Sequence, residues 1–225
     1  MNINLTPRLS AVASLVKGDG IIADIGTDHG YLPIYLIQTG KVKRAIAADI
    51  GQMPLENARK SVKESELEDK IELRLSDGLN SFKPTDADEI VFAGMGGTLI
   101  AEKLAEIPWV KDERFHFIFQ PQSRAEDLRR FLFENGFEIN CEVATHEGRR
   151  HYITFDARYT GKISEFSQSD CFIGKLTHSE DAHKHLNQQL SRLQKKYKAL
   201  KDRENDEEIE ELSQTISSIE RFING

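Results

Sequence analysis

Four aspartates in this chain of 225 residues stand at or just after the ends of apolar, strand-like runs, and their carboxylates are the first groups that suggest chemistry. Asp24 lies near the end of the first run, and Asp28 lies in the turn that follows. Asp49 and Asp77 follow two later runs. In an open α/β sheet such positions meet at one edge, where ligands bind. The four carboxylates therefore predict a shared binding site.

The turn after the first run has glycines at Gly26 and Gly30 and leads at once into an apolar, helix-like run. This layout presents backbone N–H groups and the positive end of a helix dipole to a ligand. A dinucleotide site wants glycine in the middle of such a turn, so that the backbone can approach a pyrophosphate. The middle residue here is Asp28, which would repel phosphate. The turn therefore suits a nucleoside ligand with a cationic tail, and S-adenosylmethionine fits that description.

Strands and helices alternate strictly up to Gly136, which predicts a parallel sheet with helices on both faces. The carboxyl ends of these strands should form the binding edge. The expected strands lie at 21–25, 44–50, 71–77, 89–93 and 115–119, with a closing pair at 137–143 and 151–159.

Two helix starts frame this unit. Thr6 is expected to cap a helix with Pro7 at its first position. Arg8 would lie in that first turn, from where it could reach a carboxylate if the helix lies across the ligand cleft. Ser123 is expected to cap a second helix that ends before Gly136.

Several of these residues allow a second interpretation. Asp49 would hold a ribose diol, or it could cap the next helix. Asp77 suits an adenine amino group, or it could form an Asx-turn. The glycines in Gly94-Met95-Gly96-Gly97 would let a large flat group approach the backbone, or the loop could simply need positive φ angles.

The pattern changes from about residue 160, where two apolar seams of coiled-coil period predict an antiparallel helical hairpin. The first helix is basic and the second begins with acids, so the charges could pair with each other. Part of the lysine row could instead face outward and contact a phosphate backbone. The seams consist of Leu186, Leu190, Leu193, Tyr197 and Leu200, then Ile209, Leu212, Ile216, Ile219 and Ile223.

Composition limits the remaining possibilities. A net charge of −7 argues against binding nucleic acid over the whole surface, although a local basic patch remains compatible with it. We expect no DNA partner and no membrane segment, because no apolar run approaches the length of a bilayer span. Cys141 and Cys171 lack metal-type spacing, so we expect no metal and a reducing, cytoplasmic compartment.

Together these features resemble a known family. The run from Asp24 to Pro33, the Gly-Met-Gly-Gly at 94–97, Gln120-Pro121 and the C-terminal hairpin look like the bacterial tRNA (adenine-22-N1)-methyltransferases, the TrmK family. The resemblance covers essentially the whole chain. It implies a class I, Rossmann-like α/β methyltransferase domain at 1–159 and a helical coiled-coil hairpin at 160–225. It also implies S-adenosylmethionine as donor and tRNA as acceptor, and we expect a monomer.

The resemblance assigns roles by position. The turn would line the methionine end of the donor, Asp49 and Ile50 its ribose and one adenine face, and Asp77 and Gly78 the adenine amino group. The expected donor site comprises Asp24, Gly26, Thr27, Asp28, His29, Gly30, Asp49, Ile50, Ser76, Asp77, Gly78, Ala93, Gly94 and Met95. The expected acceptor side comprises Arg8, Tyr31, Gly96, Gly97, Gln120, Arg149, Arg150, Tyr152, Lys195 and Lys198.

The loop after the fourth strand also bears on the accepting atom. Enzymes that methylate an exocyclic adenine amine usually carry an (Asp/Asn)-Pro-Pro-(Tyr/Phe) loop there, whereas this chain has Ala93-Gly94-Met95-Gly96. Ring nitrogen N1 has an in-plane lone pair and needs no proton removed before it attacks the methyl group. Catalysis can then be mostly positioning with electrostatic help.

We expect Asp28 to supply that electrostatic help and His29 to orient the base or relay a proton. Asp28 could instead only bind the donor's ammonium group, and His29 could cap the following helix. Tyr31 and Tyr152 could stack on a splayed base, or they could be packing residues. Arg149 and Arg150 could bind phosphates at the mouth of the pocket.

Two other function classes stay open at this stage. A methyltransferase of the same fold could act on a small molecule or a protein. A non-enzymatic module could bind S-adenosylmethionine or dock a partner through the hairpin, although the intact Asp24, Asp49 and Asp77 argue against a vestigial donor site.

Overall fold

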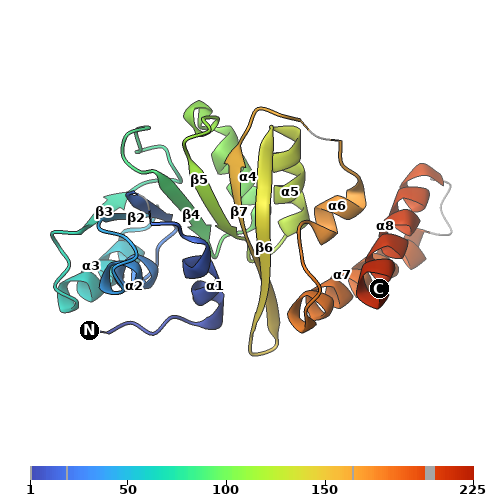
Figure 1. The fold of residues 1–225 in the computed structure, drawn as a ribbon, viewed down its shortest axis with the longest axis horizontal. Helices are drawn as coiled ribbons and strands as arrows, with labels where there is room; N and C mark the ends of the chain where they lie inside the picture. The colour runs from blue at the N-terminus through green and yellow to red at the C-terminus, as the bar shows by residue number, and fades with distance from the viewer. Residues whose placement is uncertain (1, 19, 164, 201–205) are drawn as a thin grey trace.

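The structure is a computed structural model and describes residues 2–18, 20–163, 165–200 and 206–225. Within these ranges seven strands form one sheet (Figure 1). They are β1 (Ile22–Ile25), β2 (Ala45–Asp49), β3 (Ile71–Leu75), β4 (Glu89–Ala93), β5 (His116–Gln120), β6 (Phe137–Glu147) and β7 (Arg150–Tyr159). Their order is β3-β2-β1-β4-β5-β7-β6. The first five are parallel, and β7 pairs antiparallel with both β5 and β6. The predicted α/β sheet is confirmed.

Helices cover both faces of this sheet and continue beyond its last strand. They are α1 (Pro7–Leu15), α2 (Tyr31–Gln38), α3 (Gln52–Glu64), α4 (Gly97–Ala105), the 3-10 turn η1 (Pro108–Val110), α5 (Ala125–Glu134), α6 (Gln168–Ile173), α7 (Glu180–Leu200) and α8 (Asp206–Asn224). In one place the predicted alternation was wrong. Residues 76–88, between β3 and β4, contain only turns and bends. This segment contains three Asp, two Ser, one Asn, one Gly and Pro84, residues that favour turns over helix.

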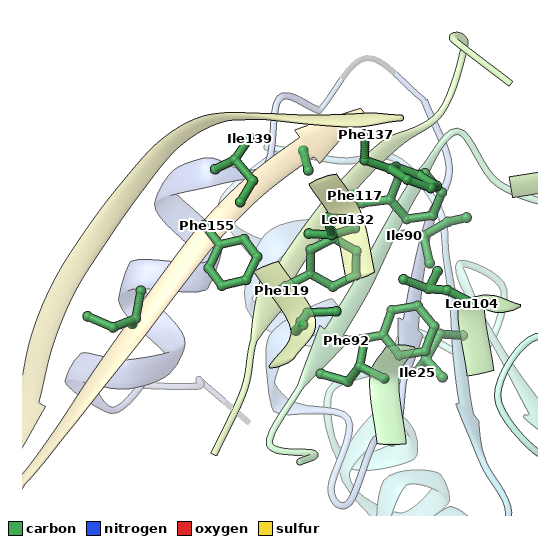
Figure 2. Close-up of a cluster of buried hydrophobic side chains, with 14 of the residues drawn as sticks. Ile25, Ile90, Phe92, Leu104, Phe117, Phe119, Leu132, Phe137, Ile139 and Phe155 are labelled. Carbon is green, nitrogen blue, oxygen red and sulfur yellow. The ribbon is translucent and has the colours of Figure 1, made fainter. Parts of the chain in front are cut away.

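Strands β1, β2, β4 and β5 bury both faces, and alternate residues belong to two separate cores. In β4, Ile90 and Phe92 pack in the larger core, while Val91 packs in the smaller core beneath α1 and α2. The larger core is aromatic: the rings of Phe117 and Phe119 stack with centroids 5.8 Å apart (Figure 2). This two-sided burial explains why the strand runs are almost continuously apolar.

The predicted helix starts had different outcomes. Thr6 caps α1 and Pro7 occupies its first turn, as predicted. The prediction that Ser123 caps α5 was wrong. The cap residue is Arg124, in the left-handed region at φ 58°, and no side chain caps the helix. The carbonyl of Ser123 instead accepts a hydrogen bond from Gly97 N at 2.8 Å, which ties the loop after β5 to the loop after β4.

The C-terminal helices pack on the sheet unit rather than standing apart from it. The buried leucines of α7 and α8, Leu186, Leu193 and Leu212, belong to the same hydrophobic cluster as the strands. The short helix α6, which the sequence analysis did not predict, lies between α5 and α8 (Figure 1). No helix in the described ranges is long and apolar enough to span a bilayer.

Charge pairing between α7 and α8 occurs at one described place, where Lys196 Nζ lies 2.8 Å from Glu208 Oε1. Two further basic residues that lengthen the lysine row, Lys201 and Arg203, lie outside the described residues. Of the two free cysteines, Cys171 is buried and Cys141 is exposed.

A buried histidine joins three strands at the edge opposite the glycine turn. His116 Nδ1 lies 2.9 Å from Glu89 Oε2, and its Nε2 lies 2.9 Å from Asp156 Oδ2. Burial disfavours the charged imidazole, but the hydrogen bonds to Asp156 and Glu89 outweigh it and raise the pKa of His116. Hydrogen bonds from His116, Cys141 and Asn140 hold the pKa of Asp156 well below its usual range despite burial. The histidine is therefore a cation clamped between two carboxylates.

This arrangement of His116 between two carboxylates predicts that the folded state loses stability at alkaline pH. A His whose folded pKa is raised stabilises the fold fully below pH 6.5, and this contribution disappears as the pH rises through the folded pKa. We expect His116→Gln to lose about 3–5 kcal/mol of unfolding free energy at pH 6. The loss should shrink at pH 9, as measured by urea denaturation. A penalty independent of pH would show that the imidazole is not charged in the fold.

Candidate active site

The turn after β1 is held by backbone hydrogen bonds and by positive φ angles. Gly26 N and Thr27 N both donate to Ala48 O, at 2.8 and 3.0 Å. Gly26 and Gly30 have φ values of 82° and 68°, which favour glycine. Gly30 is also the cap residue of α2, and no side chain caps that helix. The alternative that His29 caps the helix is therefore wrong.

Asp24 is the buried carboxylate of the site. It lies at the end of β1, is 6% exposed and accepts a hydrogen bond from the Thr27 side chain. Burial raises its pKa from 3.8 to about 6, an effect that Asp49 reinforces and that Thr27 and Arg8 oppose. The fold therefore keeps a carboxylate here at a free-energy cost, and a cationic ligand would relieve that cost.

Asp28 and His29 face solvent beside this buried acid. Asp28 Oδ2 lies 3.3 Å from His29 Nε2, and the two side chains are 70% and 42% exposed. The His29 ring stacks on Tyr31, with centroids 5.1 Å apart and planes within 14°. The three side chains thus form an open, partly aromatic wall to which an incoming planar group has access.

Asp49, at the end of β2, completes a cluster of three carboxylates. Its Oδ1 accepts from Gly51 N at 2.7 Å, within the loop that starts α3. Burial raises the pKa of Asp49, and the nearby charge of Asp28 raises it further, while Gly51 opposes the shift. Asp24, Asp28 and Asp49 therefore influence one another, and the site is strongly negative.

Exposed apolar side chains surround this negative site. Ile50 is 68% exposed, and Leu75, at the end of the neighbouring strand β3, is 51% exposed. Met53 in the first turn of α3 is 77% exposed. The predicted site includes Ile50 but not Leu75, the last residue of β3, or Met53, which comes four residues after the end of β2. Such surface is suited to one face of an aromatic ring.

The loop after β3 contains the fourth aspartate. Ser76 is buried, and its hydroxyl donates to Gly78 O at 2.9 Å while accepting from Ser81 N. The Asp77 carboxylate forms an ion pair with Lys103 Nζ at 2.9 Å. The sequence analysis missed Lys103, which comes from α4 and has no local signal. Asp77 is therefore already partly neutralised.

The loops after β4 and β5 lie together as predicted for one edge. Gly94 N donates to Gln120 O at 3.0 Å, and Gln122 N donates to Met95 O at 2.8 Å. A Cβ on Gly97 would lie 2.2 Å from the carbonyl oxygen of Arg124, so only glycine fits there. Ala93 ends β4, and Gly96 bridges to Ser123.

Arg8 reaches this edge from α1. Its Nη1 donates to Gln120 Oε1 at 2.7 Å, and its guanidinium lies 5.9 Å from the ring centroid of Tyr152. Its charge also acts on Asp24. Tyr152 is only 8% exposed, so its ring is a buried neighbour of the cleft.

The basic candidates separate into two groups. Arg149 and Arg150 are exposed at the tip of the β6–β7 hairpin, which extends past the carboxyl end of β5. Lys195 and Lys198 are exposed on α7. The last residue of α7 that lines the groove beside the hairpin is Arg192. Lys195 and Lys198 lie about 4.5 and 9 Å beyond it along the helix axis and do not line that groove. The structure therefore does not gather the lysines with the other candidates.

Comparison with known proteins places this geometry among methyltransferases. A family model for the methyltransferase domain matches residues 5–155. The tRNA (adenine(22)-N(1))-methyltransferase of Bacillus subtilis is 35% identical over 150 residues, which span 67% of this chain and 63% of that protein. The aligned part thus covers less than two thirds of that relative's length.

Two crystal structures resemble almost the whole chain. The B. subtilis m1A22 tRNA methyltransferase TrmK has a TM-score of 0.86 at 28% identity, covering 99% of this chain and 100% of that chain. A Streptococcus pneumoniae candidate tRNA (m1A22) methyltransferase, in complex with S-adenosyl-L-methionine, has a TM-score of 0.81 at 33% identity. That match covers 96% of this chain and 98% of the other.

The buried carboxylate at the end of β1 predicts that Asp24→Asn stabilises the protein. Because the folded pKa of about 6 exceeds the ordinary 3.8, the folded state binds more protons between these values, and stability falls as the pH rises. We expect the variant to gain roughly 2–3 kcal/mol at pH 7.5, measured by urea denaturation without ligand. Between pH 4 and 6 its stability should vary less than that of the wild type. Asp69→Asn, at an exposed position, serves as control; equal stability of Asp24→Asn and wild type would refute the burial argument.

Proposed function

We infer that this chain, which belongs to the family of tRNA (adenine-22-N1)-methyltransferases, transfers a methyl group from S-adenosylmethionine to ring nitrogen N1 of adenine 22 in tRNA. The observation that carries this proposal is the negative cluster of Asp24, Asp28 and Asp49 at the carboxyl edge of the sheet. The 35% identical B. subtilis enzyme and the pneumococcal structure with its bound methyl donor support it.

The residues present fit the methyl donor. Its ammonium and sulfonium groups are cationic, and Asp24 is a buried carboxylate whose pKa burial raises to about 6. Asp49 stands at the strand end that holds a ribose diol in this class of sheet. The exposed faces of Ile50 and Leu75 supply apolar surface for the adenine ring. When bound, the donor supplies an electrophilic methyl group.

The acceptor chemistry needs little from the protein beyond position and charge. The N1 lone pair forms the new bond to the methyl carbon while the carbon–sulfur bond breaks, and its electron pair goes to sulfur. The positive charge moves from sulfur to the base. Asp28, open to solvent at the edge of the site, is placed to stabilise this charge. His29, stacked on Tyr31, orients the base or relays a proton.

We propose that the tRNA is recognised by more than the donor domain. Arg149 and Arg150 at the hairpin tip contact phosphates near the target base, and the outward lysines Lys195 and Lys198 extend the contact along α7. The division into a methyltransferase domain at 1–159 and a helical coiled-coil hairpin at 160–225 belongs to this proposal. So does a monomer that works on tRNA, and not on DNA, in the cytoplasm.

The first test is the identity of the modified nucleoside. We expect the purified protein to place one labelled methyl group per unmodified tRNA, found by mass spectrometry as 1-methyladenosine at position 22. A methyl group on the exocyclic amine, or on another nucleotide, would contradict the reading of the loop 93–96. Transfer to protein or to small molecules, with tRNA untouched, would contradict the whole proposal.

The second test separates catalysis from donor binding. Replacing Asp28 with Asn should lower kcat roughly 100-fold at saturating donor, because the charge that faces the methylated base is lost. The calorimetric Kd for S-adenosylmethionine should change much less. Asp69→Asn is the matched control at an exposed carboxylate far from the site. If Asp28→Asn raises only the KM for the donor and leaves kcat intact, Asp28 binds the ammonium group and does not assist the transfer.

A further inference from the structure

A groove of about 500 Å³ opens beside the proposed acceptor side. It lies between the loop after β5, the tip of the β6–β7 hairpin and the N-terminal half of α7 (Figure 1). It shares several residues with the edge described above, among them Gln122 and Tyr152. Gln122 is bonded through its backbone to Met95, and Tyr152 lies beneath Arg8. A ligand in this groove would therefore be a direct neighbour of a base held at the glycine loop.

The rim of the groove is cationic. Four arginines line it, namely Arg124, Arg149, Arg150 and Arg192, against one carboxylate, Glu126. Arg192 pairs with Glu126 at 2.6 Å, and Arg124 pairs with Asp127 at 2.8 Å. No ion pair is found for Arg149 or Arg150 within the described part of the chain. These two guanidinium groups are available to an anionic ligand such as a phosphate.

The floor of the groove is polar, and three of its buried side-chain atoms have no hydrogen-bond partner among the described residues. Buried atoms without a hydrogen bond, among the described residues, include His185 Nδ1, Gln189 Oε1 and His151 Nδ1, and all three residues line this groove. His185 is only 7% exposed. Asp181 Oδ1 lies 4.0 Å from His151 Nδ1, beyond hydrogen-bond distance. Unsatisfied buried polar atoms cost about 1–3 kcal/mol each, so this concentration in one groove points to a ligand that satisfies them.

The buried imidazole of His185 is neutral. Burial, and then the nearby charge of Arg129, lower the pKa of His185 to about 3. A neutral imidazole offers one donor and one acceptor, and Gln189 adds an amide. An inorganic anion would use the arginines and leave this floor unsatisfied. A nucleotide has a flat, polar base for the floor and a phosphate for the rim, and its size suits a pocket of this volume.

We propose that this groove binds the nucleotide next to the target adenine in the RNA strand, with its base against His185 and Gln189 and its phosphate against Arg149 and Arg150. The proposal rests on the proposed function, because it assumes an RNA strand threaded past the donor site. Adenine N1 is paired or stacked in folded tRNA, so exposing it also unstacks a neighbour. Single-stranded bases are then read by hydrogen bonds to their edges.

The test combines enzyme variants with altered tRNA. Gln189→Leu removes the unpartnered amide at nearly constant volume. We expect it to raise the KM for tRNA about tenfold, with kcat within about twofold and the Kd for S-adenosylmethionine unchanged. Gln194→Leu, the same substitution on the face of α7 that meets α8, is the control and should match the wild type.

An abasic nucleotide at tRNA position 21 or 23 tests the same contact without altering the enzyme. At one of these two positions it should raise the wild-type KM about tenfold and add little to the effect of Gln189→Leu. The proposal would be overturned if neither abasic tRNA raised the KM of the wild type. It would also be overturned if the effects of the abasic nucleotide and of Gln189→Leu on the KM multiplied, as independent effects do. The proposal would also be overturned if the double variant Arg149→Gln/Arg150→Gln raised the KM for tRNA while Gln189→Leu did not. If the wild type fails to methylate tRNA at all, the proposed function fails with it, and that outcome is distinct from the others.

Discussion

A buried ion pair between α5 and β6 also fixes α6 against the sheet. The guanidinium of Arg129, on α5, donates to both carboxylate oxygens of Glu142 on β6, at 2.9 and 2.5 Å. It also donates to the carbonyls of Cys171 and Phe172 at the end of α6. Removing one member of such a pair leaves an uncompensated buried charge. The position of α6, and of the helices that follow it, therefore depends on this contact.

The contact of Arg129 with α6 also shapes the groove beside the hairpin. Because α6 is fixed on the sheet, α7 lies against the β6–β7 hairpin, and the groove between them has defined walls. The carboxyl edge then carries opposite charges side by side: aspartates where the donor is proposed to bind, arginines where the RNA is. At physiological ionic strength charges farther apart than about 8 Å are largely screened. The net charge of −7 therefore does not prevent a local arginine cluster from attracting a phosphate.

Much of the fold could be predicted, because its signals are local. Four of the parallel strands, β1, β2, β4 and β5, were recognisable as mostly apolar runs, since strands buried on both faces keep few polar residues, and the edge strand β3 was recognisable by its alternating pattern. The start of α1 followed from Thr6 and Pro7. Errors arose where tertiary contacts override local preference. Ser123 has the right side chain for a helix cap, but its backbone bridges to Gly96, and the helix begins two residues later. The short α6 has no apolar period to reveal it.

The sequence alone determined which carboxylates and glycines meet at the carboxyl edge, because the topology of a parallel sheet brings every strand end there. It also determined the character of the site, since Asp28 in the turn disfavours phosphate whatever surrounds it. Only the tertiary structure decided which of these groups are already partnered. Lys103 pairs with Asp77, Arg8 donates to Gln120, and the buried Nδ1 atom of His185 has no hydrogen-bond partner within the described part of the chain. Each of these facts joins segments far apart in the chain, and such contacts depend on packing that no local pattern encodes.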